Sequence, residues 1–179
     1  MKINYFGKPY SFTHLAAIRR FGENHKYLPR DTIDETVNNL EKNSIAIVPI
    51  ENTYGGIINE TMNLFIENKP IKILEELEMR INLYLLSNSQ TKLPKIKRIY
   101  SHDYPLKVSE GWIRKNMPNA EVRRAASTSD ACCKIREEKY SCAIASEEAA
   151  EYYGLKKLGN IKIEGKKNIT RFFVIRAKN

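Results

Sequence analysis

The chain has 179 residues, of which 42% are hydrophobic and 28% are charged, a composition typical of globular proteins that bury a core. Its 30 basic and 21 acidic residues give a formal net charge of +9, which raises the local concentration of anionic ligands. The basic residues stand in short, scattered groups without interleaved aromatic residues, which argues against a nucleic-acid-binding surface.

The N-terminal residues run straight into a stretch of strand character, and no apolar run in the sequence is long enough to cross a bilayer. We therefore expect no signal peptide, no membrane association and a cytoplasmic location. The three cysteines, at positions 132, 133 and 142, lack metal-ligand spacing and fit a reducing compartment. The three histidines show no such spacing either, so we expect no metal site.

Short apolar stretches with strand character alternate with helical patterns along the chain. We predict strands at 3–6, 45–50, 96–100, 142–145 and 172–175. Helices are predicted at 32–41 with Asp31 as the cap, at 105–115, at 130–138, and at 146–153, where Gly154 can end the helix in the left-handed conformation. The alternation predicts an α/β fold with largely parallel strands.

The segment 71–85 has a different pattern, because almost every odd position is apolar and the even positions are mostly polar. A period of two over this length is unusual for one strand. We interpret it as an extended strand, bent or broken near Glu75 and Glu76, that passes from one lobe to another. The prediction is two α/β lobes with a cleft between them, where a small ligand would bind. Residues 1–74 with 168–179 form the first lobe, 75–158 the second, and 159–167 the return crossing.

Small hydroxyl residues stand at several predicted helix starts, namely Ser11, Thr13, Thr128, Ser129 and Ser146. Each alone is more consistent with a helix cap than with a ligand contact. Together they favour an anion site, because helix amino ends carry free amide donors. The turn at 53–56 adds two glycines that let a ligand approach the backbone. These features suit a small molecule with several carboxylates, although they name no reaction.

Thr170 and Arg171 stand side by side at the start of the last predicted strand, where two polar side chains are costly unless something uses them. They belong to the hexapeptide Asn168-Ile169-Thr170-Arg171-Phe172-Phe173. Six further segments precede this hexapeptide in the chain: 7–17, 49–53, 100–102, 127–131, 143–146 and 153–155. As a set, these segments resemble the catalytic domain of the prephenate dehydratases over nearly the whole chain.

The resemblance implies a periplasmic-binding-protein type II-like fold and a carbon-oxygen lyase of phenylalanine biosynthesis. Such an enzyme converts the dicarboxylate prephenate to phenylpyruvate, releasing water and carbon dioxide, without a metal or organic cofactor. The catalytic residues implied by the resemblance are Thr170, as donor to the departing hydroxyl group, Asn52 and Ser101; the implied substrate-binding residues are Thr53, Thr128, Ser129, Arg171, Ser11 and Thr13. Arg171 has an alternative role, which is to brace the loop by pairing with Glu51.

Two positions depart from the usual pattern of the family. Tyr10 replaces a glycine, and Val108 replaces a glutamine that would donate a hydrogen bond in the expected site. The regulatory ACT domain that commonly follows is not in this sequence, so we expect no evident binding domain for control by phenylalanine, unless the sequence is a piece of a longer chain or a separate chain supplies the ACT domain. An exposed lobe edge is compatible with a homodimer. Three alternatives stay open: an arogenate dehydratase, a prephenate decarboxylase, and a non-catalytic paralogue that binds a small anion.

Overall fold

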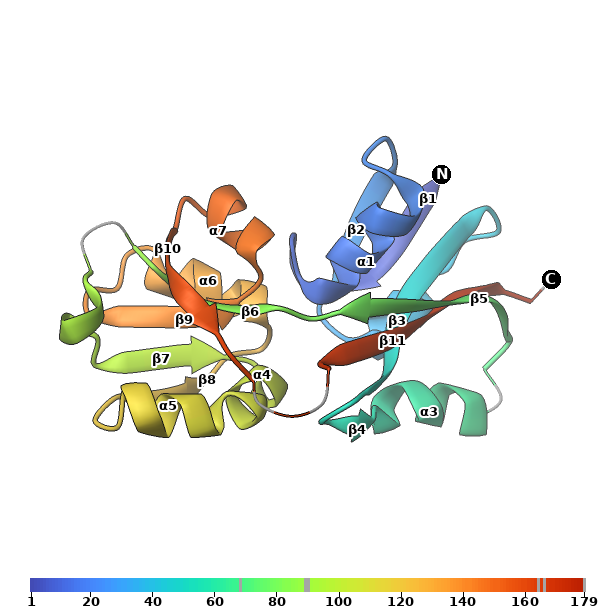
Figure 1. Cartoon of the computed structure of the whole chain (residues 1–179). Helices are drawn as coiled ribbons and strands as arrows, with labels where there is room; N and C mark the ends of the chain where they lie inside the picture. Colours follow the sequence, from blue (N-terminus) through green and yellow to red (C-terminus); the bar gives the residue numbers. More distant parts are fainter. Residues whose placement is uncertain (68, 89–90, 164, 166, 179) are drawn as a thin grey trace. The chain divides into compact units, whose positions relative to one another are not determined.

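The chain folds into two compact units. The computed structural model describes residues 1–67, 69–88, 91–163, 165 and 167–178. Unit 1 comprises Met1–Ile81 and Lys167–Asn179, and unit 2 comprises Asn82–Lys166. The chain therefore leaves unit 1 once and returns to it once, and the predicted double crossing is confirmed (Figure 1).

Unit 1 is built on a mixed β-sheet. Its strands are β1 (Lys2–Phe6), β2 (Lys26–Arg30), β3 (Ser44–Asn52), β4 (Gly56–Ile57), β5 (Ile71–Arg80) and β11 (Ile169–Ala177). Their order is β2-β1-β3-β11-β5, and β4 pairs with β3. β1 runs parallel to β2 and β3, whereas β11 runs antiparallel to β3 and β5. The sheet is less parallel than the sequence favours, because β11 enters from the return crossing and not through a helical crossover.

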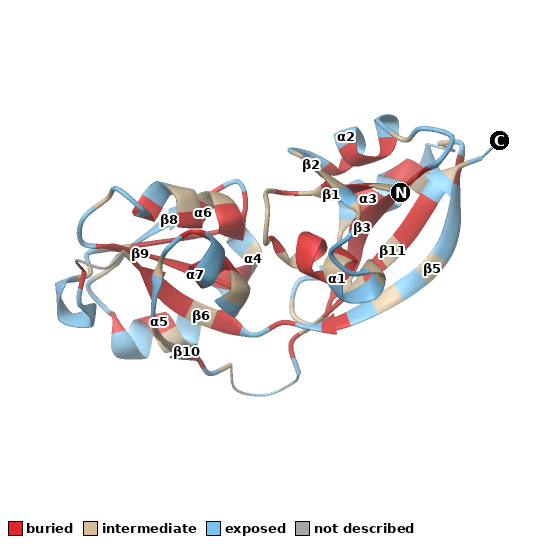
Figure 2. Ribbon diagram, turned by 90° about the horizontal axis from the view of Figure 1, so that it is seen from above, coloured by how far each residue is buried: buried red, intermediate tan, exposed pale blue. Residues whose placement is uncertain are grey.

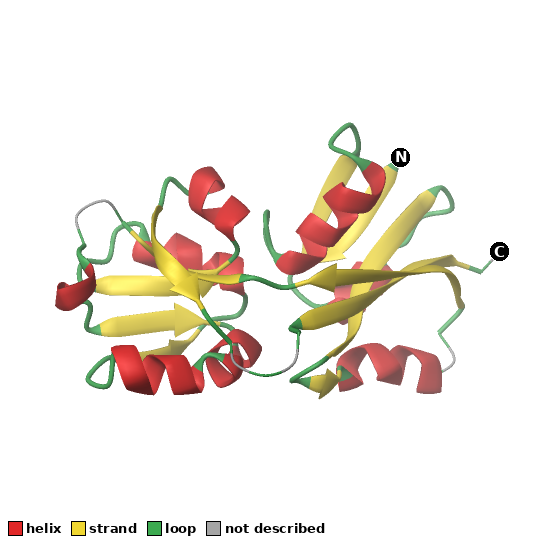
Figure 3. Ribbon diagram, in the orientation of Figure 1, coloured by secondary structure: helices red, strands yellow, loops and turns green. Residues whose placement is uncertain are grey.

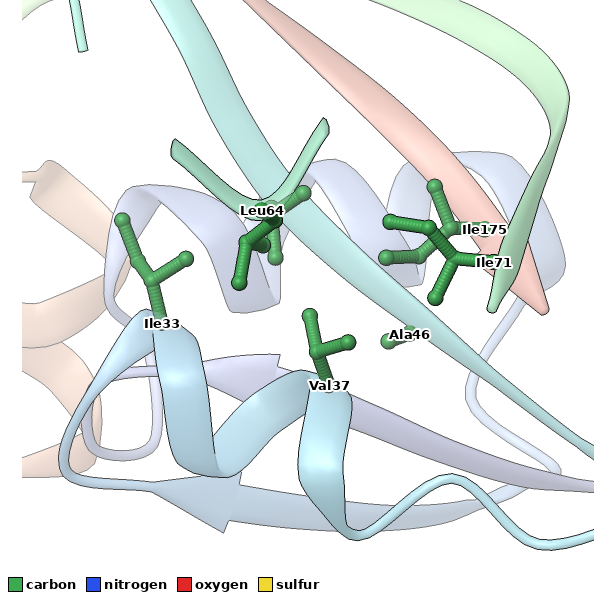
Figure 4. Packing of buried hydrophobic residues seen from close by; sticks show 7 residues of the cluster. Ile33, Val37, Ala46, Leu64, Ile71 and Ile175 are labelled. Atoms are coloured by element: carbon green, nitrogen blue, oxygen red, sulfur yellow. The ribbon is translucent and has the colours of Figure 1, made fainter. Parts of the chain in front are cut away.

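Helices cover both faces of this sheet: α1 (Phe12–Phe21), α2 (Ile33–Asn38) and α3 (Asn59–Ile66). On one face, residues of α2 and α3 pack against the strands in a buried apolar cluster, of which Figure 4 labels Ile33, Val37, Ala46, Leu64, Ile71 and Ile175. Successive side chains of a strand point to opposite faces. Ile47, next to Ala46, therefore faces the other side, where α1 packs and its His14 ring stacks on Tyr5. Each fully buried Ile or Leu contributes about 1.5–3 kcal/mol to folding.

The cap of α2 is Thr32, not Asp31 as the sequence predicts. Thr32 Oγ1 accepts a hydrogen bond of 3.0 Å from the backbone N–H of Glu35. A capping side chain must reach the amide three residues ahead, in the first turn. Asp31 stands one residue too early for a helix that begins at Ile33.

Unit 2 has its own mixed sheet, with β6 (Leu83–Ser87), β7 (Arg98–Ser101), β8 (Glu121–Arg124), β9 (Ser141–Ala145) and β10 (Lys156–Ile161) in the order β10-β6-β9-β7-β8. Its α-helices are α4 (Asp103–Val108), α5 (Glu110–Asn116), α6 (Thr128–Ile135) and α7 (Glu147–Tyr152), and a short 3-10 helix covers Leu93–Lys95 (Figure 3). The single helix predicted at 105–115 is two helices that meet at Ser109. In each unit a central strand is almost wholly buried, β3 in unit 1 and β9 in unit 2, whereas the edge strand β5 is mostly exposed (Figure 2).

The segment 71–85 holds two strands, and the break between β5 and β6 falls at Ile81 and Asn82. Near Glu75, where we expected the bend, the pairing of β5 with β11 shifts register and leaves Leu74 as a bulge. The units accordingly divide after residue 81 and not after 74. Both strands alternate apolar and polar residues, so periodicity alone does not locate a break between them. Of the predicted return crossing 159–167, the first residues belong to β10, and residues 164 and 166 lie outside the described part.

Candidate active site

Polar side chains gather at one edge of the unit 1 sheet, where β1 and β3 end and β11 begins. β1 ends at Phe6 and β3 ends at Asn52, and these strands are parallel. β11 is antiparallel to β3, so its first residues return to the same edge, where Thr170 stands in register with Asn52. The carboxyl ends of parallel strands are where α/β folds bind ligands. This edge is therefore the place to build a site from its contacts.

The orientation of the Asn52 side chain is set by the backbone. Its Oδ1 accepts hydrogen bonds from the backbone N–H of Tyr54, at 2.8 Å, and of Gly55, at 3.4 Å. A backbone amide can only donate, so the oxygen of the Asn52 amide must face this turn. Its nitrogen then faces the opposite way, toward the start of β11.

Two residues receive the Asn52 amide protons. Nδ2 of Asn52 donates to Thr170 Oγ1 at 2.7 Å and to Asn168 Oδ1 at 3.0 Å. All three residues are buried, with exposed fractions of 5% for Asn52, 8% for Thr170 and 6% for Asn168. Because an amide N–H cannot accept, the Thr170 oxygen must be the acceptor.

The Thr170 hydroxyl consequently keeps its own proton for another acceptor. Across residues 1–67, 69–88, 91–163, 165 and 167–178, the structure records no acceptor for this O–H. A hydroxyl that already accepts a hydrogen bond is a stronger donor, since hydrogen-bonded chains polarise one another. The edge thus presents a buried, polarised O–H donor at a fixed position.

The other residues predicted on this edge have partners within the fold. Thr53 Oγ1 lies 3.1 Å from the carbonyl oxygen and 3.2 Å from the nitrogen of Ile169, so its hydroxyl joins β3 to β11. The Arg171 guanidinium pairs with Glu76 at 2.6 Å and with Glu51 at 3.3 Å. The bracing contact with Glu51 that we gave as an alternative is present, and both carboxylates raise the pKa of Arg171.

The loop after β1 brings Ser11 and Thr13 to the same edge. Ser11 caps α1, since its Oγ accepts from the His14 N–H at 3.4 Å and donates to the Phe6 carbonyl at 3.2 Å. Thr13 is buried in the first turn. Gly7 has a φ of 95°, and a Cβ there would lie 3.0 Å from Ser11, so both the conformation and the space require glycine. The hydroxyl at the helix start is therefore a cap, the commoner role that we weighed for it.

Tyr10, the residue that replaces a glycine, keeps a backbone conformation that favours glycine. Its φ is 61°, which costs a side-chain-bearing residue about 1–2 kcal/mol. In this conformation the Tyr10 N–H donates to Nδ1 of His14 at 2.9 Å, and the two rings meet edge to face. The substitution therefore adds an aromatic ring and strain, while the backbone follows a path that a glycine would adopt freely.

His14 is a neutral histidine of fixed tautomer. Its ring stacks on Tyr5 with centroids 4.4 Å apart and meets the edges of Tyr10 and Tyr27. Burial lowers its pKa from 6.5 to about 4. Because Nδ1 accepts from Tyr10, the single proton of the neutral ring sits on Nε2. Sequence inspection found no metal spacing for His14 and assigned it no role.

In unit 2, the hydroxyl of Ser101 is engaged in the opposite sense to that of Thr170. Ser101 ends β7 and is fully buried, and its Oγ donates to the carbonyl oxygen of Ile144 at 2.6 Å. This bond joins the end of β7 to the neighbouring strand β9. The Ser101 oxygen retains acceptor capacity, but its proton is committed to the backbone.

The start of α6 carries the remaining predicted residues. Ser127 caps the helix by accepting from the Asp130 N–H at 2.9 Å, and Asp130 reaches back to the Ala126 N–H at 3.3 Å. Thr128 and Ser129 are buried in the first turn. Ser146 likewise caps α7 through the Ala149 N–H at 3.2 Å. Val108, the other departure from the family pattern, is half-buried at the end of α4.

Asn168 is the functional candidate that the sequence analysis missed. It stood in the hexapeptide that opened the resemblance, but no pattern distinguished it from a loop residue. Its value lies in a contact with Asn52 across 116 positions of sequence, which only tertiary structure creates.

In the described ranges 1–67, 69–88, 91–163, 165 and 167–178, no group of three or more metal-ligating side chains comes together, and no helix is long and apolar enough to span a membrane.

Comparison with known proteins identifies the family of this arrangement. The model of the prephenate dehydratase family matches residues 3–179. A bifunctional chorismate mutase/prephenate dehydratase of Aquifex aeolicus is 36% identical over 182 residues, covering 100% of this chain and 49% of that protein. The chain thus spans about half the length of the curated relatives it matches.

Solved structures agree with the fold. A prephenate dehydratase of Staphylococcus aureus matches with a TM-score of 0.80 and 25% identity, over 100% of this chain and 67% of that one. A prephenate dehydratase of Arthrobacter aurescens matches with a TM-score of 0.88 and 22% identity, over 100% of this chain and 61% of that one. These matches confirm the predicted fold class of two α/β units.

Proposed function

Since the chain belongs to the prephenate dehydratase family, which matches it over residues 3–179, we propose that it converts prephenate to phenylpyruvate as a carbon-oxygen lyase of phenylalanine biosynthesis. The observation that carries the proposal is the buried Thr170 hydroxyl, which accepts from Asn52 at 2.7 Å and so keeps its proton for a ligand. A donor of this kind suits a reaction in which a hydroxyl group departs.

The proposed reaction breaks two bonds of the substrate ring. The ring carboxylate leaves as carbon dioxide, and the electron pair of its carbon-carbon bond enters the ring as the carbon-oxygen bond of the hydroxyl breaks. The ring becomes aromatic, and the departing oxygen takes up one proton and leaves as water. The balance therefore needs one proton from solvent. The enzyme has to hold the substrate carboxylates and stabilise the charge that develops on the departing oxygen.

Thr170 supports that oxygen as a positioned donor. A hydroxyl is too weak an acid to protonate the leaving group unaided, but a hydrogen bond that strengthens in the transition state lowers the barrier. Well-placed donors of this kind contribute about 10²–10⁴-fold to the rate. Asn52 sharpens the donation, because its backbone-anchored amide polarises and aims the Thr170 hydroxyl.

The substrate carboxylates bind to amide donors and are attracted by the positive charge of the chain. We assign this role to the starts of α1 and α6, where Ser11, Thr13, Thr128 and Ser129 stand. The first amides of a helix favour anions. The net charge of +9 helps to attract a dianion. For Ser101, the hydrogen bond to the Ile144 carbonyl favours a structural role, in which it joins the end of β7 to β9.

The test is to incubate the purified protein with prephenate and to follow phenylpyruvate and carbon dioxide. We expect turnover that falls by about 10²–10⁴-fold in Thr170→Ala and is largely kept in Thr170→Ser, which retains the hydroxyl. Thr61→Ala is the matched control, because Thr61 is also a buried threonine and donates to the Pro49 carbonyl of β3 at 2.6 Å. It should lose stability but keep its rate per folded molecule.

The outcomes separate the rival functions. No turnover of prephenate, or a Thr170→Ala variant as fast as the wild type, contradicts the proposal. A product that keeps the hydroxyl group identifies a decarboxylase, and faster conversion of arogenate identifies the aminated substrate. Tight binding of prephenate by calorimetry without any product identifies a non-catalytic binder.

A further inference from the structure

Asn168 lies where the returning chain re-enters unit 1. Its backbone carbonyl accepts from the Ile81 N–H at 2.8 Å, and Ile81 is the last residue before the chain leaves the unit. The residue is buried, with an exposed fraction of 6%, and its Oδ1 accepts from Asn52 Nδ2 at 3.0 Å. One residue therefore joins the two crossing segments through its backbone and reaches Asn52 through its side chain.

We propose that Asn168 is a positioning residue for the dehydration. By accepting one proton of the Asn52 amide group, Asn168 keeps the other amide proton directed at the Thr170 oxygen. The inference rests on the proposed function for its effect on rate. The geometry is that of a planar NH₂ group with two protons in fixed directions. When Asn168 accepts one of them, the other points at Thr170 Oγ1, 2.7 Å away.

The backbone turn alone does not fix this alignment as firmly. Tyr54 and Gly55 hold Oδ1 of Asn52, but their bonds of 2.8 and 3.4 Å allow the side chain to swing about the oxygen. A bond to Asn168 on the nitrogen side removes that freedom, because the amide is then held at both ends. Loss of the Asn168 acceptor leaves a buried N–H without a partner, which favours rotation of the amide or entry of water.

The backbone of Asn168 makes this side chain separable from the fold. Its carbonyl bond to Ile81 and the bonds of the next residue, Ile169, with Thr53 do not involve the Asn168 side chain. Substitutions at 168 therefore change the acceptor for Asn52 while the crossing segments stay paired. Asn4 supplies a matched control, because it is 1% exposed in β1 and its Oδ1 accepts from the Arg30 Nε at 2.9 Å.

The kinetic experiment compares Asn168→Ala, Asn168→Asp and Asn4→Ala. Misplacement of a catalytic group by about 1 Å costs on the order of 10²-fold, so we expect kcat of Asn168→Ala to fall by about 10–100-fold, with KM changed by less than about threefold. Asn168→Asp keeps an acceptor when ionised and should recover most of the rate. Its kcat should fall at acid pH as the new carboxylate takes up a proton, an acid limb that the wild type and Asn4→Ala lack.

Two kinetic results overturn the inference. One is a kcat of Asn168→Ala within about twofold of the wild type, or a loss that appears only in KM. The other is an Asn168→Asp variant as slow as Asn168→Ala at every pH, since rescue by an acceptor is the signature of positioning. Rates are taken per folded molecule, with thermal unfolding of each variant measured alongside.

A second readout does not depend on turnover. By NMR, the side-chain amide protons of Asn52 should exchange slowly with water in the wild type and in Asn4→Ala. Exchange should be at least about tenfold faster in Asn168→Ala, for the proton that bonds Thr170 as well as for the other. Unchanged exchange in Asn168→Ala overturns the inference even if prephenate is turned over. Faster exchange without turnover by the wild type keeps the inference about the amide and contradicts the proposed function.

Discussion

Thr170 in unit 1 and Ser101 in unit 2 are both buried hydroxyl residues near strand termini, and the resemblance to the family implies a catalytic role for both. Their hydrogen bonds run in opposite directions. Thr170 accepts from the Asn52 side chain at 2.7 Å, whereas Ser101 donates to the Ile144 carbonyl at 2.6 Å. A hydroxyl has one proton to donate. Among the residues that the structure describes, the Thr170 proton therefore has no acceptor, whereas the Ser101 proton joins two strands.

The difference shows that a partner decides what a hydroxyl can do. An amide nitrogen forces Thr170 to accept, and a carbonyl oxygen leads Ser101 to donate. Both side chains carry a hydroxyl group and both stand near a strand terminus, Thr170 near the start of β11 and Ser101 at the end of β7. The following predictions change the partner or the hydroxyl, from the largest expected effect to the smallest.

Asn52→Asp should make Thr170 behave like Ser101. The carboxylate keeps the acceptor for the Tyr54 N–H but replaces the donor to Thr170 with an acceptor. The Thr170 hydroxyl then donates to residue 52, and its proton is lost to the substrate. We expect kcat for prephenate to fall by about 10²-fold or more.

The control for that variant is Asn4→Asp, which places a new carboxylate in the same sheet, beside Arg30, and should keep its kcat. If Asn52→Asp turns over prephenate within about twofold of the wild-type rate, the direction of the Asn52–Thr170 bond does not matter. The assignment of Thr170 as the donor then fails as well.

His14 extends the comparison to a ring whose tautomer is set by a backbone amide. Burial lowers its pKa from 6.5 to about 4, so the folded protein holds the neutral form while the unfolded chain takes up a proton below about pH 6.5. The contribution of His14 to the free energy of unfolding is therefore fully present above pH 6.5 and is lost as the pH drops toward 4. The loss has an upper limit of about 3 kcal/mol, which solvent screening lowers. The groups that face this ring are Tyr5, Tyr10 and Tyr27.

Urea unfolding at a series of pH values measures how the free energy of unfolding changes with pH, and His14→Phe is the variant for comparison. Phenylalanine keeps a ring to stack on Tyr5 but cannot titrate or accept from the Tyr10 N–H. The variant should be less stable at pH 7, and the part of the slope between pH 6.5 and 4 that comes from His14 should disappear. An identical slope in both proteins shows that His14 is not the titrating group.

Ser101→Ala should have the smallest effect on the reaction. The variant leaves the Ile144 carbonyl without this donor, which costs about 1–3 kcal/mol of folding free energy and lowers the melting temperature. Turnover per folded molecule should stay within about threefold of the wild type. If turnover falls as far as in Thr170→Ala while the melting temperature is unchanged, Ser101 takes part in catalysis.

Much of this protein follows from local patterns in the chain. The alternation of strand and helix predicts the α/β class, and the alternating segment 71–85 predicts that the chain passes between two units; both are confirmed. Hydroxyl residues at helix starts predict the caps at Ser11 and Ser146. These features depend on residues within a few positions of one another, so the sequence determines them directly.

Contacts across long stretches of chain decided the rest. Asn52 meets Thr170 and Asn168 across 118 and 116 positions, and Ser101 meets Ile144 across 43. The direction of a hydrogen bond depends on which atom arrives opposite a hydroxyl, and no periodicity or motif encodes that choice. The sequence by itself determined the fold class and placed Thr170 in a recognisable motif. Only the tertiary structure decided that the Thr170 hydroxyl accepts a hydrogen bond from Asn52, because pairing of β11 with β3 brings the Asn52 amide nitrogen to the Thr170 oxygen.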